Sequence, residues 1–299
     1  MSTQIPNAPL PVHSTPDVGD NDFSVLLSEP FAQVWAQPDT KLAGAQAGRE
    51  RLLVRLMASR AEQAHMFTAR RRKVPRQALS EGVVVQTLYE CQKDFQKDFQ
   101  TAQNLRPGEP LRVRLIEMAA GASLPANVCA AESTLRSRHC EWLVISGSVQ
   151  RGDERLSARD YFVSPAGHES PIWFSAEGAL LFLRESDVAS NTDERPFTIR
   201  DADAGWPDFA PGIQRRVLWQ RDGQAAMLYY AQAGAEVPVH THGHDEECLM
   251  VQGELFLDDL LLQTGDYQLA PAGSGHRITH TDTGVVIYAH GDLDLKFVN

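Results

Sequence analysis

The pattern of hydrophobic and polar positions changes near residue 80. In the stretch AQAGRERLLVRLMASRAEQA (45–64), four apolar side chains recur at spacings that place them on one face of a helix: Leu52, Leu53, Leu56 and Met57. We therefore expect a helical N-terminal segment over 22–79, after a disordered, proline-rich tail at 1–21. The apolar face of this helix would pack against the domain that follows or, alternatively, dock a partner.

From about residue 80 onward, short apolar runs alternate with turn residues. The runs include VVVQTLY, LRVRLIEM, EWLVISGSV and DYFVSPAG, and then RRVLW, AAMLYYAQ, ECLMVQGEL and DYQLAPAG. Many short strands separated by glycine, proline and aspartate are typical of a sandwich or barrel. The predicted fold class is all-β, with helix only in the N-terminal segment.

The β-rich region contains an internal repeat. Residues 140–184 align without a gap with residues 246–290, at a constant offset of 106. Glycines recur where turns are needed and apolar residues recur at strand spacing, which indicates two tandem domains of one fold. We place these domains at 80–188 and 205–299, joined by a linker at 189–204.

The segment HTHGHDEE (240–247) concentrates histidines and acids in the second copy. It lies inside a two-part pattern, G(X)5HXH(X)3E(X)6G beginning at Gly234 and G(X)5PXG(X)2H beginning at Gly265. A lone HXH pair would be weak evidence, because histidine pairs on a strand are often ordinary surface residues. Here every fixed position of both parts is filled, so the signal is strong.

This spacing predicts a metal site. Side chains at positions i and i+2 of a strand point to the same face, so His240 and His242 point one way. Glu246 can join them from the next strand and His276 from a separate hairpin. Burying three imidazoles and a carboxylate together is costly unless something satisfies them, and a divalent metal does so. The predicted metal ligands are His240, His242, Glu246 and His276.

Four neighbouring polar residues are left out of this set. His244 and Asp245 lie in the turn after His242, and whether His244 is simply exposed there is left open. Glu247 follows Glu246 on a strand and should point to the other face. His280 is expected beside the site or at the surface. The competing interpretation is that the histidines are surface residues that bind no metal.

The first copy has lost these residue types. At the positions of the four predicted ligands it has Asn127, Cys129, Cys140 and Ser170. We expect a degenerate domain that serves as a scaffold or as a dimer surface. The alternative is that Cys129 and Cys140 form a redox pair or a soft-metal site. An insertion at 91–110 is expected to form an exposed loop or a short helix.

Composition and charge narrow the class of protein. The chain has 299 residues, enough for two domains, and its net charge of −11 argues against general binding of nucleic acid or of anionic lipid. No apolar run is long enough to cross a bilayer and no secretory signal is visible, so we expect a cytoplasmic location. The four cysteines contain no CXXC pair and are expected to remain thiols.

One basic cluster stands out against the acidic background. It consists of Arg70, Arg71, Arg72, Lys73 and Arg76. Its expected role is to form a solvated approach to the first β-domain, and the alternative is a patch that binds a partner.

The two-part histidine pattern resembles that of the cupin superfamily. The second copy, from PVHTHGHDEECLMVQGEL to GDYQLAPAGSGH, closely resembles the cupins of ChrR-type zinc-binding anti-sigma factors, and the resemblance extends over about 48–299. It implies a jelly-roll cupin fold and one zinc ion bound by the four predicted ligands, and the additional β-domain is a departure from the single-cupin members of the family. The family's N-terminal HXXXCXXC zinc motif is absent, because the first 90 residues hold only His13 and His65 and no cysteine. Binding of a sigma factor is therefore not implied.

The resemblance leaves different functions open. The leading hypothesis is a metal-binding sensor or regulatory protein with zinc and a protein partner. The alternative is a mononuclear dioxygenase with iron, manganese or nickel that acts on a small diketone-like or phenolic-ketone-like substrate. In that case Glu246 could act as ligand and general base, and the pocket wall would draw on Tyr229, Tyr230, Tyr267, Met250 and Cys248. A binding protein without catalysis is a third possibility, and a homodimer is expected.

Overall fold

The computed structural model describes residues 43–298, except 64, 92–109, 126–127, 129–137, 169–171 and 189–193. The predicted tail at 1–21 and nearly all of the insertion at 91–110 lie outside the described residues, as do Asn127, Cys129 and Ser170. No helix among the described residues is long and apolar enough to span a membrane.

Among the described residues, the helix ends before the predicted boundary at residue 79. Helix α3 spans Ala43–Gln63, and its apolar side chains at Leu52 and Met57 are 56% and 71% exposed. The chain is then extended in β1 (Phe67–Ala69) and β2 (Gln77–Ser80). The prediction of helix up to residue 79 was therefore wrong. Main-chain pairing of β1 with a strand of the second domain outweighs the local pattern there.

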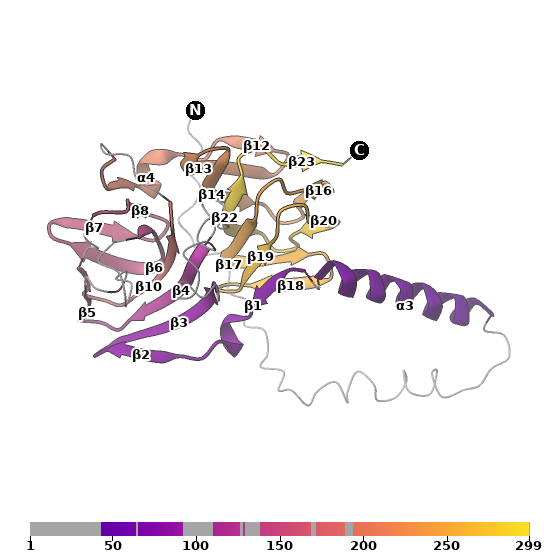
Figure 1. Ribbon diagram of the computed structural model, residues 1–299, viewed down its shortest axis with the longest axis horizontal. Coiled ribbons are helices and arrows are strands. Elements are labelled where there is room, and N and C mark those ends of the chain that lie inside the picture. The colour runs from indigo at the N-terminus through magenta and orange to yellow at the C-terminus, as the bar shows by residue number, and fades with distance from the viewer. Residues whose placement is uncertain are drawn as a thin grey trace, which may run out of the picture. The chain divides into compact units, whose positions relative to one another are not determined.

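Two antiparallel sheets of ten strands each make up the β-rich part (Figure 1). The first has the order β11-β8-β6-β10-β4-β3-β2, with β5, β7 and β9 attached beside this path. The strands of the first domain are β3 (Val83–Glu90), β4 (Pro110–Met118), β5 (Ala122–Leu124), β6 (His139–Arg151), β7 (Glu154–Ser157), β8 (Tyr161–Ser164), β9 (Trp173–Ser175) and β10 (Ala179–Ser186).

The second sheet repeats the first. Its order is β1-β19-β17-β22-β14-β13-β12, with β15, β18 and β21 attached, and a separate three-stranded sheet has the order β20-β16-β23. The strands are β12 (Asp208–Ala210), β13 (Ile213–Arg221), β14 (Gln224–Ala231), β15 (Glu236–Val237), β16 (His240–Thr241), β17 (Glu246–Leu257), β18 (Leu260–Gln263), β19 (Tyr267–Ala270), β20 (Gly275–His276), β21 (Thr279–His280), β22 (Val285–Asp292) and β23 (Lys296–Phe297).

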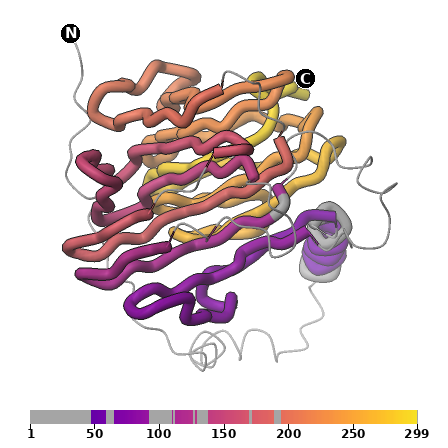
Figure 2. The backbone as a smooth tube through the Cα atoms, turned by 60° about the vertical axis from the view of Figure 1, so that its left-hand side comes forward, coloured from indigo at the N-terminus to yellow at the C-terminus, as the bar shows by residue number. Residues whose placement is uncertain are grey.

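Each ten-stranded sheet includes one strand from the segment that precedes the other domain. Strand β1, which precedes the first domain, pairs with β19 of the second, and β11 (Phe197–Ile199), which precedes the second domain, pairs with β8 of the first. The segment predicted as a linker at 189–204 thus contains a strand, followed by the short helix α4 (Asp201–Ala204). Figure 2 shows the strands of both halves, magenta to salmon and orange to yellow, running in similar directions.

A buried charge network joins the two domains. Arg184 of β10 is fully buried, and its guanidinium lies 2.8 Å from Glu141 of the first domain and 2.7 Å from Glu247 of the second. These two glutamates occupy equivalent positions of the repeat. Tyr161 and Tyr288 donate hydrogen bonds of 2.6 and 2.8 Å to Glu141.

The two glutamates of this network differ in the direction of their pKa shifts. Burial would raise the pKa of Glu141, but the charge of Arg184 outweighs burial and lowers this pKa to about 2. Burial raises the pKa of Glu247 despite the same guanidinium and despite a hydrogen bond of 2.8 Å from Tyr267. One cation therefore bridges two buried carboxylates, one from each domain.

Replacing Arg184 with methionine should destabilise the chain strongly. The change keeps an apolar stem of similar length but leaves two buried glutamates without their cation, which costs about 3–5 kcal/mol. Urea unfolding followed by circular dichroism measures the loss. Arg155→Ala, at a side chain that is 66% exposed in an ion pair of 3.8 Å with Glu177, is the control and should cost less than about 1 kcal/mol. Equal effects of the two substitutions would contradict the structural role given to Arg184.

Candidate metal centre

Two short strands set the first pair of histidines opposite each other. In the antiparallel pairing of β16 with β20, His240 is the direct partner of His276. Gly275 makes this approach possible, because a Cβ atom at this position would lie 2.3 Å from the carbonyl oxygen of His240. Backbone pairing of β20 with β16 therefore holds His276 beside His240, as the predicted hairpin required.

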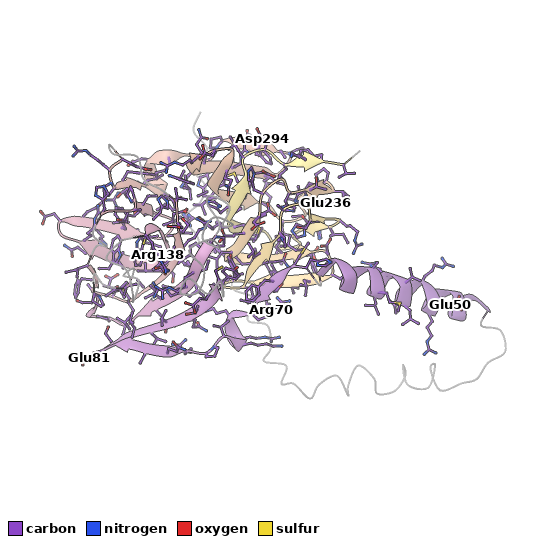
Figure 3. All side chains as sticks on the ribbon, viewed as in Figure 1. Glu50, Arg70, Glu81, Arg138, Glu236 and Asp294 are labelled. Atoms are coloured by element: carbon purple, nitrogen blue, oxygen red, sulfur yellow. The ribbon has the colours of Figure 1, made fainter. Side chains whose placement is uncertain are left out.

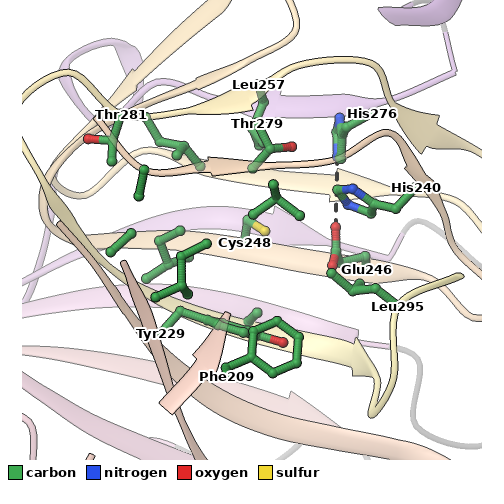
Figure 4. A pocket seen from close by; sticks show the side chains of 17 residues that line it. Phe209, Tyr229, His240, Glu246, Cys248, Leu257, His276, Thr279, Thr281 and Leu295 are labelled. Atoms are coloured by element: carbon green, nitrogen blue, oxygen red, sulfur yellow. Dashed lines mark ion pairs between the residues drawn. The ribbon is translucent and has the colours of Figure 1, made fainter. Parts of the chain in front are cut away.

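The four predicted ligands converge at one end of the second domain. His240, His242 and Glu246 each offer a ligand atom within 4.8 Å of the others. The Nδ1 atom of His242 lies 3.1 Å from the Glu246 carboxylate, and the Nε2 atom of His276 lies 3.7 Å from it. The ring of His276 is 5.1 Å from that of His242 and 5.7 Å from that of His240. Figure 4 shows His240, Glu246 and His276 side by side at the edge of a cavity.

Two ring nitrogens in this group fit a bound cation. The Nε2 atoms of His242 and His276 are buried and have no hydrogen-bond partner among the described residues. An unsatisfied buried nitrogen is costly, and native structures seldom tolerate one without a reason. A divalent metal bound among three imidazoles and a carboxylate would satisfy both atoms.

Polar neighbours fix the orientation of the imidazoles. The Nδ1 atom of His240 lies 2.9 Å from the carbonyl oxygen of Pro238. The Nδ1 atom of His276 lies 3.2 Å from the carboxylate of Asp258. Asp258 adopts a left-handed backbone with φ 55° and also accepts a hydrogen bond of 2.7 Å from the amide of Arg277. Such contacts leave the Nε2 atoms of both rings turned toward the site, as in many metal-binding histidines.

Asp258 was missed by the sequence argument. It belongs to a turn between two strands, LDDL, which is an ordinary place for aspartate. No spacing rule connects this turn to a histidine 18 positions further on, so the sequence carries no signal for the contact.

The electrostatics of the site favour an ionised carboxylate. Burial would raise the pKa of Glu246, but attraction to His242 and a hydrogen bond from it, with further attraction to His276 and His240, lowers this pKa to about 2. Burial lowers the pKa of His240. For His242, attraction to Glu246 exceeds the effect of burial and raises the pKa. At neutral pH the site therefore offers a negative oxygen among imidazole nitrogens.

An apolar cavity of about 60 Å³ adjoins the histidines (Figure 4). Its wall includes Glu246, His240 and His276 on one side and mostly apolar side chains elsewhere, among them Phe209, Leu255, Leu257, Ile287 and Ala289. Of the five side chains suggested for the pocket wall, Tyr229 and Cys248 are present in it. Met250 lies instead in the core of the second domain, Tyr267 bonds to Glu247 at the domain interface, and Tyr230 packs on Trp206.

The polar residues left out of the predicted set lie elsewhere. His244 forms an ion pair with Asp292, and Asp245 accepts a hydrogen bond of 2.8 Å from the amide of Ala272. Glu247 points away from Glu246 and into the domain interface, which confirms the alternation expected along β17. His280 stacks on Phe256 at a ring distance of 6.4 Å.

In the first domain the corresponding space is filled. Trp142 occupies the repeat position of Cys248, Trp173 that of Thr279, and Leu183 that of Ala289. All three side chains are buried in one apolar core, where the two indole rings lie 5.6 Å apart. Cys140, at the position of Glu246, is buried, and its thiol donates to the carbonyl of Arg138 at 3.4 Å. The suggested pairing of Cys129 with Cys140 lies outside the described residues.

Comparison with known protein families agrees with this geometry. Residues 194–294 match the sequence model of the ChrR cupin-like domain. The fold is that of two tandem cupin domains, and the second of them matches the ChrR cupin-like family model. A search of curated protein sequences returned no significant match.

Several solved structures are similar in fold to most of this chain. A proposed dioxygenase from Nostoc punctiforme is similar with a TM-score of 0.59 at 15% identity, over 78% of this chain and 85% of that one. A bacterial pirin from Escherichia coli in complex with nickel(II) has a TM-score of 0.54 at 12% identity, over 78% of this chain and 100% of that one. An oxalate decarboxylase from Lactobacillus farciminis, a formate complex, has a TM-score of 0.52 at 12% identity, over 77% of this chain and 87% of that one. At these identities the likeness concerns the fold.

Proposed function

We propose that the second cupin domain binds one divalent metal through His240, His242, Glu246 and His276, and that the bicupin is a metal-dependent enzyme. The observation that carries the enzymatic part is the cavity beside His240, Glu246 and His276. Structural zinc sites are closed by their protein ligands, whereas catalytic sites keep one coordination position open toward a substrate space. A site made only to stabilise the fold has no need of an apolar chamber at its edge.

A five- or six-coordinate metal held by these four ligands would supply a Lewis-acid or redox centre with an open position. Three imidazoles and one carboxylate suit zinc, iron, manganese or nickel. The proposed reaction class is oxygen-dependent cleavage of a small, largely apolar substrate that carries adjacent oxygens, such as a diketone. A protein of related fold that is named as a proposed dioxygenase supports this class by analogy, and the pirin in complex with nickel(II) supports the presence of a metal.

The other side chains of the cavity would bind and orient the substrate. Burial raises the pKa of Tyr229 to about 12, so its hydroxyl stays protonated at neutral pH and can donate a hydrogen bond to a substrate oxygen. Burial raises the pKa of the Cys248 thiol well above its ordinary value, which makes this residue a poor nucleophile and a poor metal ligand. The aliphatic wall excludes water from the chamber.

A second candidate function rests on helix α3. Leu53 and Leu56 are 49% and 48% exposed, in addition to the exposed Leu52 and Met57. A helix with exposed apolar side chains is suited to docking a protein partner. Together with the ChrR-like second domain, this observation supports a regulatory protein in which the metal centre responds to a ligand and α3 holds the partner. Zinc would then be the expected metal.

Removal of one predicted ligand should remove the metal. In His276→Ala the site loses an imidazole, and we expect metal content to fall from about one per chain to less than a tenth, since ligand loss costs at least as much as the 10–100-fold typical of loss of a supporting contact. Elemental analysis of protein purified without chelator measures this. His280→Ala removes a nearby histidine that points elsewhere and should leave metal content unchanged. Equal metal content in the two variants would contradict the assignment.

Metal affinity should fall as the pH falls. An imidazole binds metal only when it is neutral, so protons compete with the metal as the pH drops below about 6. The interaction of His242 with Glu246, which raises the histidine pKa, works in the same direction. Dialysis at a series of pH values followed by metal analysis should show full occupancy at pH 7.5 and release by about pH 5. Full retention at pH 4 would argue against histidine ligands.

Filling the cavity should abolish turnover while metal remains bound. Ala289→Leu places in the second domain the residue type found at the equivalent position of the first, and it should reduce oxygen consumption at least about tenfold by occupying the substrate space. The measurement is oxygen uptake with 2,4-pentanedione as the probe, alongside metal content. Ala225→Leu, in a buried alanine outside the cavity wall, is the packing control. If only metal content changed in Ala289→Leu, the cavity would not be a substrate site.

A further inference from the structure

The basic segment before the first domain lines a groove that shares no wall residue with the cavity beside the histidines. This groove has a volume of about 520 Å³, and four arginines lie along it: Arg70, Arg71, Arg72 and Arg76. The rest of its wall comes from both domains, through Val74 and Gln86 on one side and Leu261, Gln263, Thr264 and Asp266 on the other. Arg70 is labelled in Figure 3, where β1 ends.

The charges in the groove do not cancel. Arg70 is paired with the Asp266 carboxylate at 2.8 Å, and this carboxylate is 8% exposed. Glu117 lies 2.9 Å from Arg76 and 3.7 Å from Arg71. Arg72 is exposed and forms no ion pair with any residue in the described part of the chain. Four guanidinium groups against two carboxylates leave two positive charges, in a protein whose net charge is −11.

The repeat provides an internal comparison. Residues 67–90 align without a gap with 197–220, at a constant offset of 130. The pair of Arg70 with Asp266 has its counterpart in Arg200 and Asp160, whose side chains lie 3.2 Å apart. The backbone anchor is repeated as well, because Asp266 accepts from the amide of residue 71 at 2.9 Å and Asp160 from the amide of residue 201 at 2.8 Å.

In the second copy the equivalent region neutralises its own charges. Asp201 takes the position of Arg71, and its carboxylate lies 2.8 Å from Arg159 and 2.9 Å from Arg216. Trp206 takes the position of Arg76, and the guanidinium of Arg216 lies 4.3 Å from its ring centroid. A carboxylate of the chain itself thus holds the arginines together there.

The two copies differ at several positions that contact one another. Arg159, which forms an ion pair with Asp201, has Gly265 as its counterpart in the repeat. A Cβ atom on Gly265 would lie 2.4 Å from the Cδ atom of Arg71, so this glycine leaves the room that the Arg71 side chain occupies. One copy has a closed set of ion pairs, whereas the other has an open groove in which four arginines face only two carboxylates, Asp266 and Glu117.

We propose that the groove binds a small, doubly charged oxyanion of the phosphate-ester class, held chiefly by Arg71, Arg72 and Arg76. The anion would supply the negative charge that Asp201 supplies in the other copy. The planar guanidinium matches the oxygens of a phosphate with paired hydrogen bonds. The surplus of two positive charges equals the charge of a phosphate ester at neutral pH. This site is independent of the metal centre and of the reaction proposed for it.

Calorimetric titration of the full chain with inorganic phosphate and with pyrophosphate tests this proposal. At low ionic strength we expect saturable binding with one site per chain. Arg72→Ala, which removes an exposed side chain without an ion pair in the described part of the chain, should weaken binding by about tenfold. The control is Arg195→Ala, which removes the same charge at an exposed arginine outside the groove and should change affinity less than about twofold.

A second variant tests the proposal in case neighbouring arginines maintain phosphate binding when Arg72 is lost. Arg76→Gln removes another exposed guanidinium of the groove and should also weaken phosphate binding by about tenfold. The proposal would be overturned by absence of saturable binding at millimolar phosphate. It would be overturned as well by equal weakening in Arg72→Ala, Arg76→Gln and Arg195→Ala, which would mean general attraction to charge.

Discussion

The two functions of strand β17 depend on one constraint, the alternation of side chains along an extended backbone. Glu246 points into the second barrel, among the three histidines, while Glu247 points the other way, to Arg184 at the domain interface. The two carboxylates are therefore neighbours in sequence and belong to different networks. Because Arg184 also holds Glu141, the strand that carries the centre of the histidine site is fixed to the other domain. The cost of burying these charges is offset only while all members of the network are present.

The repeat shows how one fold serves different purposes in its two copies. Trp142 and Trp173 fill in the first barrel the space that Cys248 and Thr279 leave open in the second. Large side chains in the core favour stability, whereas small ones beside the histidines leave a chamber for a ligand. The regions before the two domains diverge in the same way, with a closed set of ion pairs around Asp201 and an open groove around Arg71. One open space therefore lies inside the second domain, and the other lies between the basic segment and residues 261–266.

The sequence predicted the local features and missed those that depend on distant contacts. The all-β class, the repeat and the convergence of His240, His242, Glu246 and His276 all follow from spacing, because side-chain direction along a strand is fixed by the backbone. The contact of Asp258 with His276 and the burial of Arg184 between two glutamates have no such periodic signal. The strand β1 was hidden inside the predicted helical segment, because its pairing partner β19 lies 200 residues further along the chain. Tyr267 was misplaced because the sequence does not say which face of each strand meets the other domain, whereas Met250 lies in the core of the second domain but outside the cavity wall.

We infer that the second domain holds one metal and that the filled first domain holds none. Crystallography of the chelator-free protein, with anomalous diffraction data collected across the absorption edge of the metal present, tests it most directly. The account predicts one anomalous peak per chain, bounded by the Nε2 atoms of His240, His242 and His276 and by the carboxylate of Glu246. A peak beside Cys140 in the first barrel, or no peak among these histidines in metal-replete protein, would contradict it.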